Sequence, residues 1–144
     1  MITINYPPKK PMIKQEGENE LIFCIVRKRW IRITPEEWVR QNFLLYLTEV
    51  LQYPLSLIAV EKQLYLGELK KRFDIVVFDK TAQPFLIVEC KEMNVALSET
   101  VLQQVLRYNI NLQARYVVIT NGNECLAFEK QHNNFLPLEK MPVL

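Results

Sequence analysis

The charged residues Asp74, Glu89 and Lys91 stand directly beside the most apolar segments of the sequence. Asp74 precedes the apolar run 75–78, and Glu89 and Lys91 follow the run 85–88. Burying a charge is costly unless it is paired or bound to a metal. Carboxylate oxygens suit Mg²⁺ or Mn²⁺, and a nearby lysine can orient a water molecule or stabilise developing negative charge. These residue types therefore indicate a site for metal-dependent hydrolysis.

Two neighbouring strands are needed to bring these side chains together. Side chains alternate between the faces of a strand, so Glu89 and Lys91 point to one side and Cys90 to the other. The short connector 80–83 favours antiparallel pairing of the strands before and after it. In such a pair the start of one strand lies beside the end of the next, so Asp74 can meet Glu89 and Lys91.

The remaining sequence predicts helices that pack against these strands. Thr34 as N-cap and Pro35 at the first helical position predict a helix over residues 34–51, and Ser98 as N-cap predicts a second over 98–112. Strands are predicted over residues 21–26, 27–33, 55–66, 71–79, 84–91, 114–120 and 124–130. This order predicts an α/β fold, an α+β arrangement with a central mixed sheet flanked by helices.

The bulk properties indicate one domain. In the chain of 144 residues, positions 1–20 are rich in Pro, Lys and Glu and are interpreted as an extended arm before a domain over 21–144. A net charge of +2 excludes a general polycation, and three cysteines in unrelated contexts exclude a disulfide framework and a zinc cluster. We find no glycine-rich nucleotide motif, no signal peptide and no run of membrane-spanning length. We expect a cytoplasmic protein that binds neither nucleotides nor membranes.

The motifs also resemble a known family. The pattern Asp-x₁₄-Glu-x-Lys on adjacent strands resembles the PD-(D/E)xK nuclease superfamily, and Gln104-x₃-Tyr108 is similar to the QxxxY element of its RecB-like branch. Five segments resemble, in the same order, the N-terminal nuclease domain of type I restriction R (motor) subunits over roughly residues 22–130: "PEEWVRQNFLLYL", "KRFDIVVFDK", "PFLIVECK", "QQVLRYN" and "YVVITNG". The resemblance implies a restriction-endonuclease-like fold and Mg²⁺- or Mn²⁺-dependent cleavage of DNA phosphodiesters.

The resemblance also implies roles for the central residues. Asp74 and Glu89 ligate the metal, joined by the backbone carbonyl of Cys90, and Lys91 is the catalytic lysine. One departure is Phe73, which stands where many members have proline, a change that the family tolerates.

The resemblance also implies that residues on both predicted helices belong to the site. Gln104 and Tyr108 orient the site or contact the DNA backbone. A glutamate from the first helix binds the metal in many members, and Glu37 is the candidate here, with Glu36 as the second choice. The other interpretation of Glu37 is a capping box with Thr34, and the two interpretations remain open.

The basic cluster Lys70, Lys71 and Arg72 lies next to Asp74 in the sequence. A phosphate backbone that reaches the site would pass over it, so we expect sequence-independent DNA contacts there. Arg72 could instead pair with a nearby carboxylate. Cleavage of a duplex by one such site requires a second subunit or a second encounter, so a homodimer or an unidentified protein partner is a further expectation.

Two alternatives to a nuclease remain. One is a catalytically inactive module of the same fold that binds nucleic acid or protein, and the other is a structural domain with a buried ion-pair network. Type I R subunits continue into a helicase motor, whereas this sequence ends at Leu144. We therefore expect a stand-alone domain that neither hydrolyses ATP nor translocates DNA.

Overall fold

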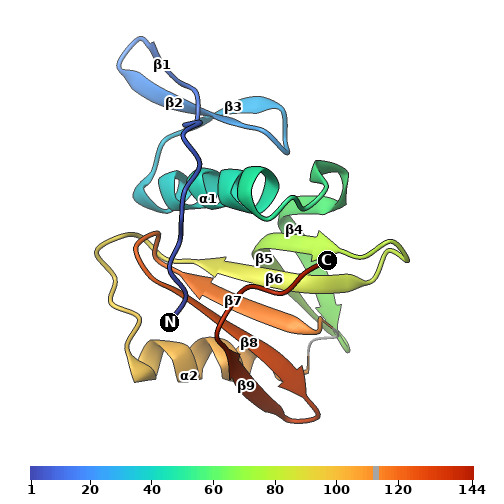
Figure 1. Ribbon diagram of the computed structural model, residues 1–144. Coiled ribbons are helices and arrows are strands. Elements are labelled where there is room, and N and C mark those ends of the chain that lie inside the picture. The colour runs from blue at the N-terminus through green and yellow to red at the C-terminus, as the bar shows by residue number, and fades with distance from the viewer. Residues whose placement is uncertain (112–113) are drawn as a thin grey trace.

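The computed structural model describes residues 1–111 and 114–144. It contains a three-stranded sheet, a six-stranded sheet and two main helices (Figure 1). The strands are β1 (Ile13–Glu16), β2 (Asn19–Cys24), β3 (Arg29–Arg32), β4 (Ile58–Leu66), β5 (Leu69–Phe78), β6 (Pro84–Cys90), β7 (Tyr116–Thr120), β8 (Cys125–Gln131) and β9 (Asn134–Leu138). The helices are α1 (Pro35–Leu45), which a π-helical turn at Tyr46–Val50 continues, a short 3₁₀ turn at Leu55–Leu57, and α2 (Glu99–Tyr108).

The six-stranded sheet is mixed, and its strands follow the order of the chain from β4 to β9. Only β6 and β7 pair in parallel; every other neighbouring pair is antiparallel. The parallel pair is joined through α2, because parallel strands need a long crossover. The predicted antiparallel meander of β4, β5 and β6 and the predicted mixed sheet are confirmed, in agreement with a restriction-endonuclease-like fold.

A helix covers each face of the large sheet, with α1 above it and α2 below it in Figure 1. The core under α1 unites Val39 and Phe43 with Ile75, Val77 and Val88. The core over α2 has at its centre Val105, Val76, Ile87, Val117 and Ile119. Because β5 and β6 are buried on both faces, their sequences are continuous apolar runs rather than alternating ones.

The start of each helix agrees with its predicted cap. Thr34 Oγ1 accepts a hydrogen bond from the backbone N–H of Glu37 at 3.0 Å, and Ser98 Oγ accepts one from Val101 at 3.3 Å. The second helix ends at Tyr108, whereas the prediction ran to Leu112, which lies outside the described residues. No helix in the described part of the chain is long and apolar enough to cross a membrane.

Part of the segment predicted as an extended arm forms a hairpin instead. Residues 13–16 make β1, which pairs antiparallel with β2 through a turn at Gly17. Gly17 has φ of +62°, a conformation that glycine adopts without steric cost. All four residues of β1 are exposed, and they do not alternate between apolar and polar types, so no pattern of period two marks this strand.

The prediction also omitted β9, which forms one edge of the large sheet. Pro137 lies within it and pairs in register with Phe128. Proline lowers the expectation of a strand, but an edge strand tolerates it because one side of the strand needs no ladder hydrogen bonds.

Candidate functional site

Asp74 and Glu89 lie side by side where β5 and β6 leave the buried core. The antiparallel register pairs Ile75 with Val88, which makes Asp74 and Glu89 the next residues outward. Asp74 Oδ2 accepts a hydrogen bond of 2.7 Å from the backbone N–H of Cys90. The carboxylate of Asp74 is thus fixed against the end of β6, as the predicted meander requires.

Glu89 is a buried carboxylate with little compensation. Its side chain is 15% exposed, and Oε1 has no hydrogen-bond partner among the described residues. Lys71 Nζ lies 3.6 Å from Oε1 and is the nearest opposite charge. Burial, and then the charge of Asp74, raise the pKa of Glu89 to about 7, against the opposing effects of Lys71 and Lys91. Glu89 therefore holds a proton at a pH where an ordinary glutamate is ionised.

This raised pKa predicts a pH-dependent stability. The folded state keeps the Glu89 proton up to a pH of about 7, whereas an ordinary glutamate loses it near 4.5. The stabilising contribution is complete below the unfolded-state pKa and is lost as the pH rises through the folded-state pKa. We expect the free energy of unfolding of wild type, relative to Glu89→Gln, to fall by on the order of 3 kcal/mol between about pH 4 and about pH 8. Urea denaturation across this range checks it, and parallel profiles of the two proteins would contradict it.

Arg40 on α1 is the centre of an ion-pair network behind Asp74. Its side chain is 5% exposed and contacts Asp74 Oδ1 at 2.9 Å, Glu37 Oε1 at 3.0 Å and Glu61 Oε1. Burial alone would lower the pKa of Arg40, but Glu37, Asp74 and Glu61 together raise it. Arg40 therefore stays charged and neutralises one side of the Asp74 carboxylate.

The two glutamates at the start of α1 have different surroundings. Glu37 accepts hydrogen bonds from Arg27, Arg40 and Gln41, and its backbone N–H is capped by Thr34. The carboxylate of Glu36 instead lies near Asp74: burial, and then the charge of Asp74, raise its pKa. The structure thus gives Glu37 its capping contact and arginine partners, and it places the carboxylate of Glu36 beside Asp74.

Lys91 extends from the end of β6 toward the same acidic residues. Its side chain is half-buried and makes no ion pair within the described part of the chain. Its positive charge opposes the rise in the pKa of both Glu36 and Glu89, so it lies within electrostatic reach of these carboxylates. Its backbone N–H donates to Thr120 O at 2.8 Å and anchors the position to β7.

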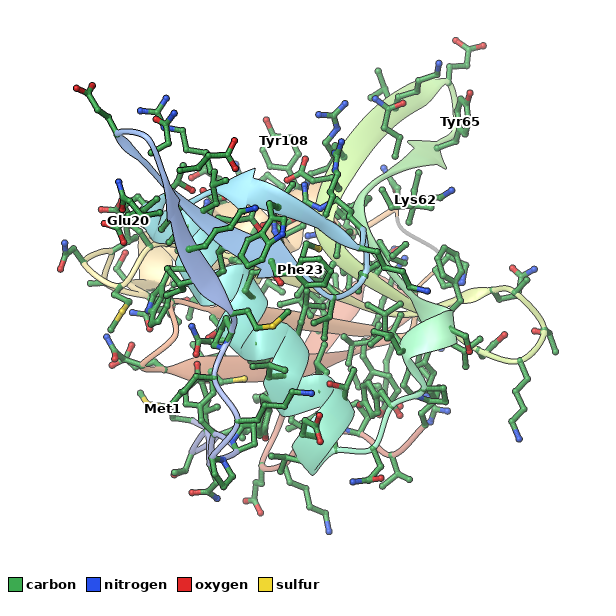
Figure 2. All side chains as sticks on the ribbon, turned by 90° about the horizontal axis from the view of Figure 1, so that it is seen from above. Met1, Glu20, Phe23, Lys62, Tyr65 and Tyr108 are labelled. Carbon is green, nitrogen blue, oxygen red and sulfur yellow. The ribbon has the colours of Figure 1, made fainter. Side chains whose placement is uncertain are left out.

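The residues of the second helix approach the site through Lys71. Lys71 Nζ lies 4.5 Å from the centre of the Tyr108 ring and also faces Glu89. Tyr108 is 60% exposed and, in Figure 2, lies at the upper margin of the view. Gln104 is exposed and lines the same surface hollow as Tyr108. The structure therefore connects Tyr108 to Glu89 and places Gln104 beside Tyr108.

The three basic residues predicted to bind nucleic acid have separate contacts. Lys71 faces Glu89, as described above. Arg72 Nη1 lies 3.6 Å from Glu61 Oε2, so the alternative of a carboxylate partner for Arg72 is confirmed. Lys70 lies over the ring of Tyr65, 5.4 Å from its centre, on the exposed part of the β4–β5 hairpin.

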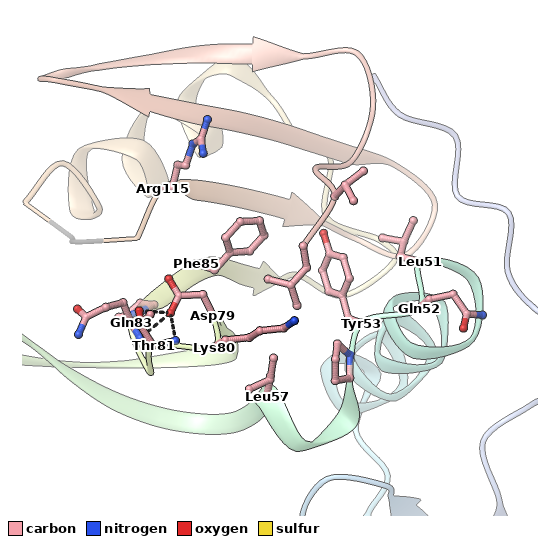
Figure 3. Close-up of a pocket in the computed structure, with 14 residues that line it drawn as sticks. Leu51, Gln52, Tyr53, Leu57, Asp79, Lys80, Thr81, Gln83, Phe85 and Arg115 are labelled. Carbon is pink, nitrogen blue, oxygen red and sulfur yellow. Dashed lines mark hydrogen bonds between the residues drawn. The ribbon is translucent and has the colours of Figure 1, made fainter.

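A cavity of about 980 Å³ lies elsewhere, at the opposite end of β5 and β6 (Figure 3). Its walls include Tyr53, Leu57 and Phe85. Two of its charged side chains are already engaged: Asp79 accepts hydrogen bonds from Thr81 and from the backbone N–H of Gln83, and Arg115 pairs with Glu129. None of the predicted site residues lines it, so its apolar walls are separate from the carboxylate site.

The acidic residues offer oxygen donors of the kind that hard divalent cations prefer. Within residues 1–111 and 114–144, no three His, Cys, Asp or Glu side chains are arranged as ligands around one point. Two features nevertheless fit a cation. One is the unpartnered Oε1 of Glu89, and the other is that burial, and then the charge of Asp74, raise the pKa of both Glu36 and Glu89. Such a cation would keep most of its ligands as waters.

Sequence reasoning missed Arg40 and Glu61. Arg40 precedes the buried Phe43 and Leu44 by three and four positions, so helical spacing placed it on the core-facing side of α1. A charged residue at such a position indicates a buried partner. Glu61 carried no comparable signal, because its contact with Arg40 joins residues 21 positions apart.

A comparison with known protein families gives a match for this chain. The family described as "Type I restriction enzyme R protein N terminus" matches residues 35–142, from the first residue of α1 to beyond β9. The match includes every predicted site residue and leaves out β1, β2 and β3. A comparison with curated proteins gave no match. Since the matched range covers most of the chain, the protein belongs to the family of type I restriction enzyme R protein N-terminal domains.

Proposed function

We propose that this domain is a Mg²⁺- or Mn²⁺-dependent nuclease that hydrolyses DNA phosphodiester bonds at Asp74, Glu89 and Lys91. The observation that carries the proposal is the pair of adjacent carboxylates on β5 and β6, with a buried oxygen of Glu89 that lacks a hydrogen-bond partner. Family membership supports it, because the family description refers to a restriction enzyme. A rigid sheet beneath the pair suits a site that must hold its groups in fixed positions.

The metal would be held by Asp74, Glu89 and the backbone carbonyl of Cys90, with the carboxylate of Glu36 next to Asp74. When bound, a divalent cation supplies positive charge to the phosphate and makes a water molecule more acidic. Asp74 is already fixed by the N–H of Cys90, so it offers an oriented oxygen. A metal site formed by these residues would therefore require little reorganisation of the backbone.

Lys91 would act on the attacking water and on the phosphate. Its ammonium group donates hydrogen bonds, so it can orient the water oxygen toward phosphorus and stabilise the negative charge that develops on the phosphate oxygens. The water oxygen would form a new bond to phosphorus as one ester P–O bond breaks. The proton that the water loses would pass to solvent, and the leaving oxygen would take up a proton from solvent. Gln104 and Tyr108 would hold the strand through its backbone, since both are exposed beside the site.

A metal titration tests the site. We expect wild type to bind Mn²⁺ or Mg²⁺ in the millimolar range or tighter by calorimetry, and the Asp74→Asn/Glu89→Gln variant to show no binding. The reason is that the double substitution removes both anionic donors while it nearly preserves side-chain shape. Equal heats for the two proteins, with and without a DNA oligonucleotide, would contradict the assignment.

The second candidate function is a non-catalytic module that binds nucleic acid. The ion pair of Arg40 with Asp74 favours it, because a carboxylate already neutralised by an arginine attracts a metal less strongly. This module predicts DNA binding that falls steeply with salt and is unaffected by metal. The nuclease predicts product formation that begins on addition of Mg²⁺ or Mn²⁺ and stops with EDTA.

A further inference from the structure

The β4–β5 hairpin continues beyond the large sheet as a two-stranded ribbon. Hydrogen-bonded pairing of β5 with β6 begins only at Ile75, whereas β4 and β5 pair with each other from Lys62 and Phe73 out to the turn. We call residues 62–73 the ribbon. Figure 2 shows Tyr65 at its outer end, away from the body of the molecule. Two-stranded hairpins are marginally stable alone, so a ligand that packs on the ribbon would also stabilise it.

A local twist at Glu61 turns the ribbon relative to the sheet. Glu61 has φ of +55°, which is uncommon for a residue other than glycine. Before it, Val60 packs with the α1 side of the sheet, whereas Leu64 packs with the α2 side. In a regular strand these two residues, four positions apart, would share a face. The carboxylate of Glu61 is held by Arg40 and Arg72, so the site network fixes the base of the ribbon.

The ribbon and α2 each present an exposed tyrosine beside a lysine. Tyr65 is 66% exposed with Lys70 over its ring, and Tyr108 is 60% exposed with Lys71 over its ring. Tyr65 pairs in register with Lys70, whereas Lys71 pairs with Leu64, so Tyr65 lies on one face of the ribbon and Tyr108 beside the other. Proteins that bind single strands combine aromatic rings, on which bases stack, with basic groups that contact phosphates.

The charge of the ribbon favours an anionic ligand. The ribbon contains four basic residues and one acidic residue, Glu68. Lys71 and Arg72 are engaged with Glu89 and Glu61, whereas Lys62 and Lys70 have no carboxylate partner among the described residues. One uncompensated positive charge, that of Lys70, thus lies in the outer part of the ribbon next to Tyr65, and the other, that of Lys62, lies at its base.

We propose that the ribbon binds a nucleic-acid strand with unpaired bases, with one base stacked on Tyr65 and a neighbouring phosphate beside Lys70. The strand then crosses the edge of β5, which β6 does not cover before Ile75, to Lys71 and Tyr108 on the other face of the ribbon, and continues to the carboxylates. Within a duplex both faces of each base are covered by its neighbours, so a ring such as that of Tyr65 has no free face on which to stack. This inference deepens the proposed function, because it assigns single-stranded or partly unpaired nucleic acid as the substrate. It rests on the proposed function, because the strand is taken to lead toward the carboxylates.

The test is binding of fluorescein-labelled oligonucleotides to the full chain, in EDTA so that no cleavage occurs. Tyr65→Ala is expected to weaken binding of an oligothymidine strand about tenfold, in keeping with the loss of one stacked base, and to change binding of a blunt duplex less than about twofold. Tyr65→Phe keeps the ring and is expected to bind like wild type. Lys70→Gln is expected to weaken binding and to reduce its salt dependence by about one phosphate contact. The matched control is Lys80→Gln, because Lys80 is an exposed lysine at the opposite end of the sheet, and this variant is expected to bind like wild type.

Several outcomes would overturn the inference. These are the absence of strand binding by wild type, equal binding of the strand by wild type and Tyr65→Ala, and an equal loss for strand and duplex. The proposed nuclease function fails separately. If the strand binds through Tyr65 but no product appears with Mg²⁺ or Mn²⁺, the ribbon inference stands and the nuclease does not. Because Tyr65 is exposed, its variants should unfold within about 2 °C of wild type.

Discussion

Replacement of Lys91 with alanine is expected to reduce metal-dependent DNA cleavage by about a hundredfold to a thousandfold while the fold is retained. The size of the loss is that of removing a group that stabilises charge in the transition state. The fold should survive because Lys91 is half-buried, makes no ion pair with the described residues and is anchored to β7 only through its backbone N–H. Initial rates on a labelled single strand and on plasmid DNA, together with thermal unfolding, measure both effects.

The matched control is Lys80→Ala, which removes an exposed lysine at the other end of the sheet. Its cleavage rate should equal that of wild type. Unchanged cleavage by Lys91→Ala would show that the lysine is not part of the reaction. A large loss of stability in Lys91→Ala would favour the structural ion-pair network instead.

The placement of the central carboxylates could be predicted because it depends on short-range rules. The period of two along a strand and the short connector between β5 and β6 were sufficient to bring Asp74 beside Glu89. Helix starts followed equally local chemistry, since Thr34 and Ser98 each cap a helix through the backbone N–H three positions later. The catalytic roles of Asp74, Glu89 and Lys91 stay predictions.

The surroundings of the carboxylates could not be predicted in the same way. The contact of Arg40 with Asp74 joins α1 to β5 across 34 positions, and no local pattern encodes such a distance. The sequence also did not distinguish Glu36 from Glu37, because both lie in the first turn of α1 and only tertiary packing directs one toward Asp74. The turn of the ribbon depends on Glu61, whose positive φ is not a preference of glutamate.

Replacement of Arg40 with methionine is expected to have the largest effect on stability. Methionine fills similar space but leaves the carboxylates of Glu37, Glu61 and Asp74 without their common partner. Breaking a buried ion pair by removing one member typically costs about 3–5 kcal/mol, because an uncompensated charge stays buried. Arg72→Met is the matched control: Arg72 shares Glu61 but is 59% exposed, so its loss should cost less than about 1 kcal/mol. Urea denaturation at neutral pH compares the two variants.

The same substitution connects stability to the proposed metal site. Arg40 places a positive charge 2.9 Å from Asp74 Oδ1, so its removal should make the carboxylates more attractive to a cation. We therefore expect Mg²⁺ or Mn²⁺ to raise the stability of Arg40→Met by more than it raises that of wild type, since a ligand that binds only the folded state stabilises it according to its affinity. If Arg40→Met is too unstable to purify, Arg40→Lys keeps the charge but lacks the planar fork that contacts several carboxylates, and it should show an intermediate loss. Equal stabilisation of wild type and variant by the metal would mean that Asp74 is not a metal ligand, and Arg40 would then be the permanent partner of a purely structural carboxylate.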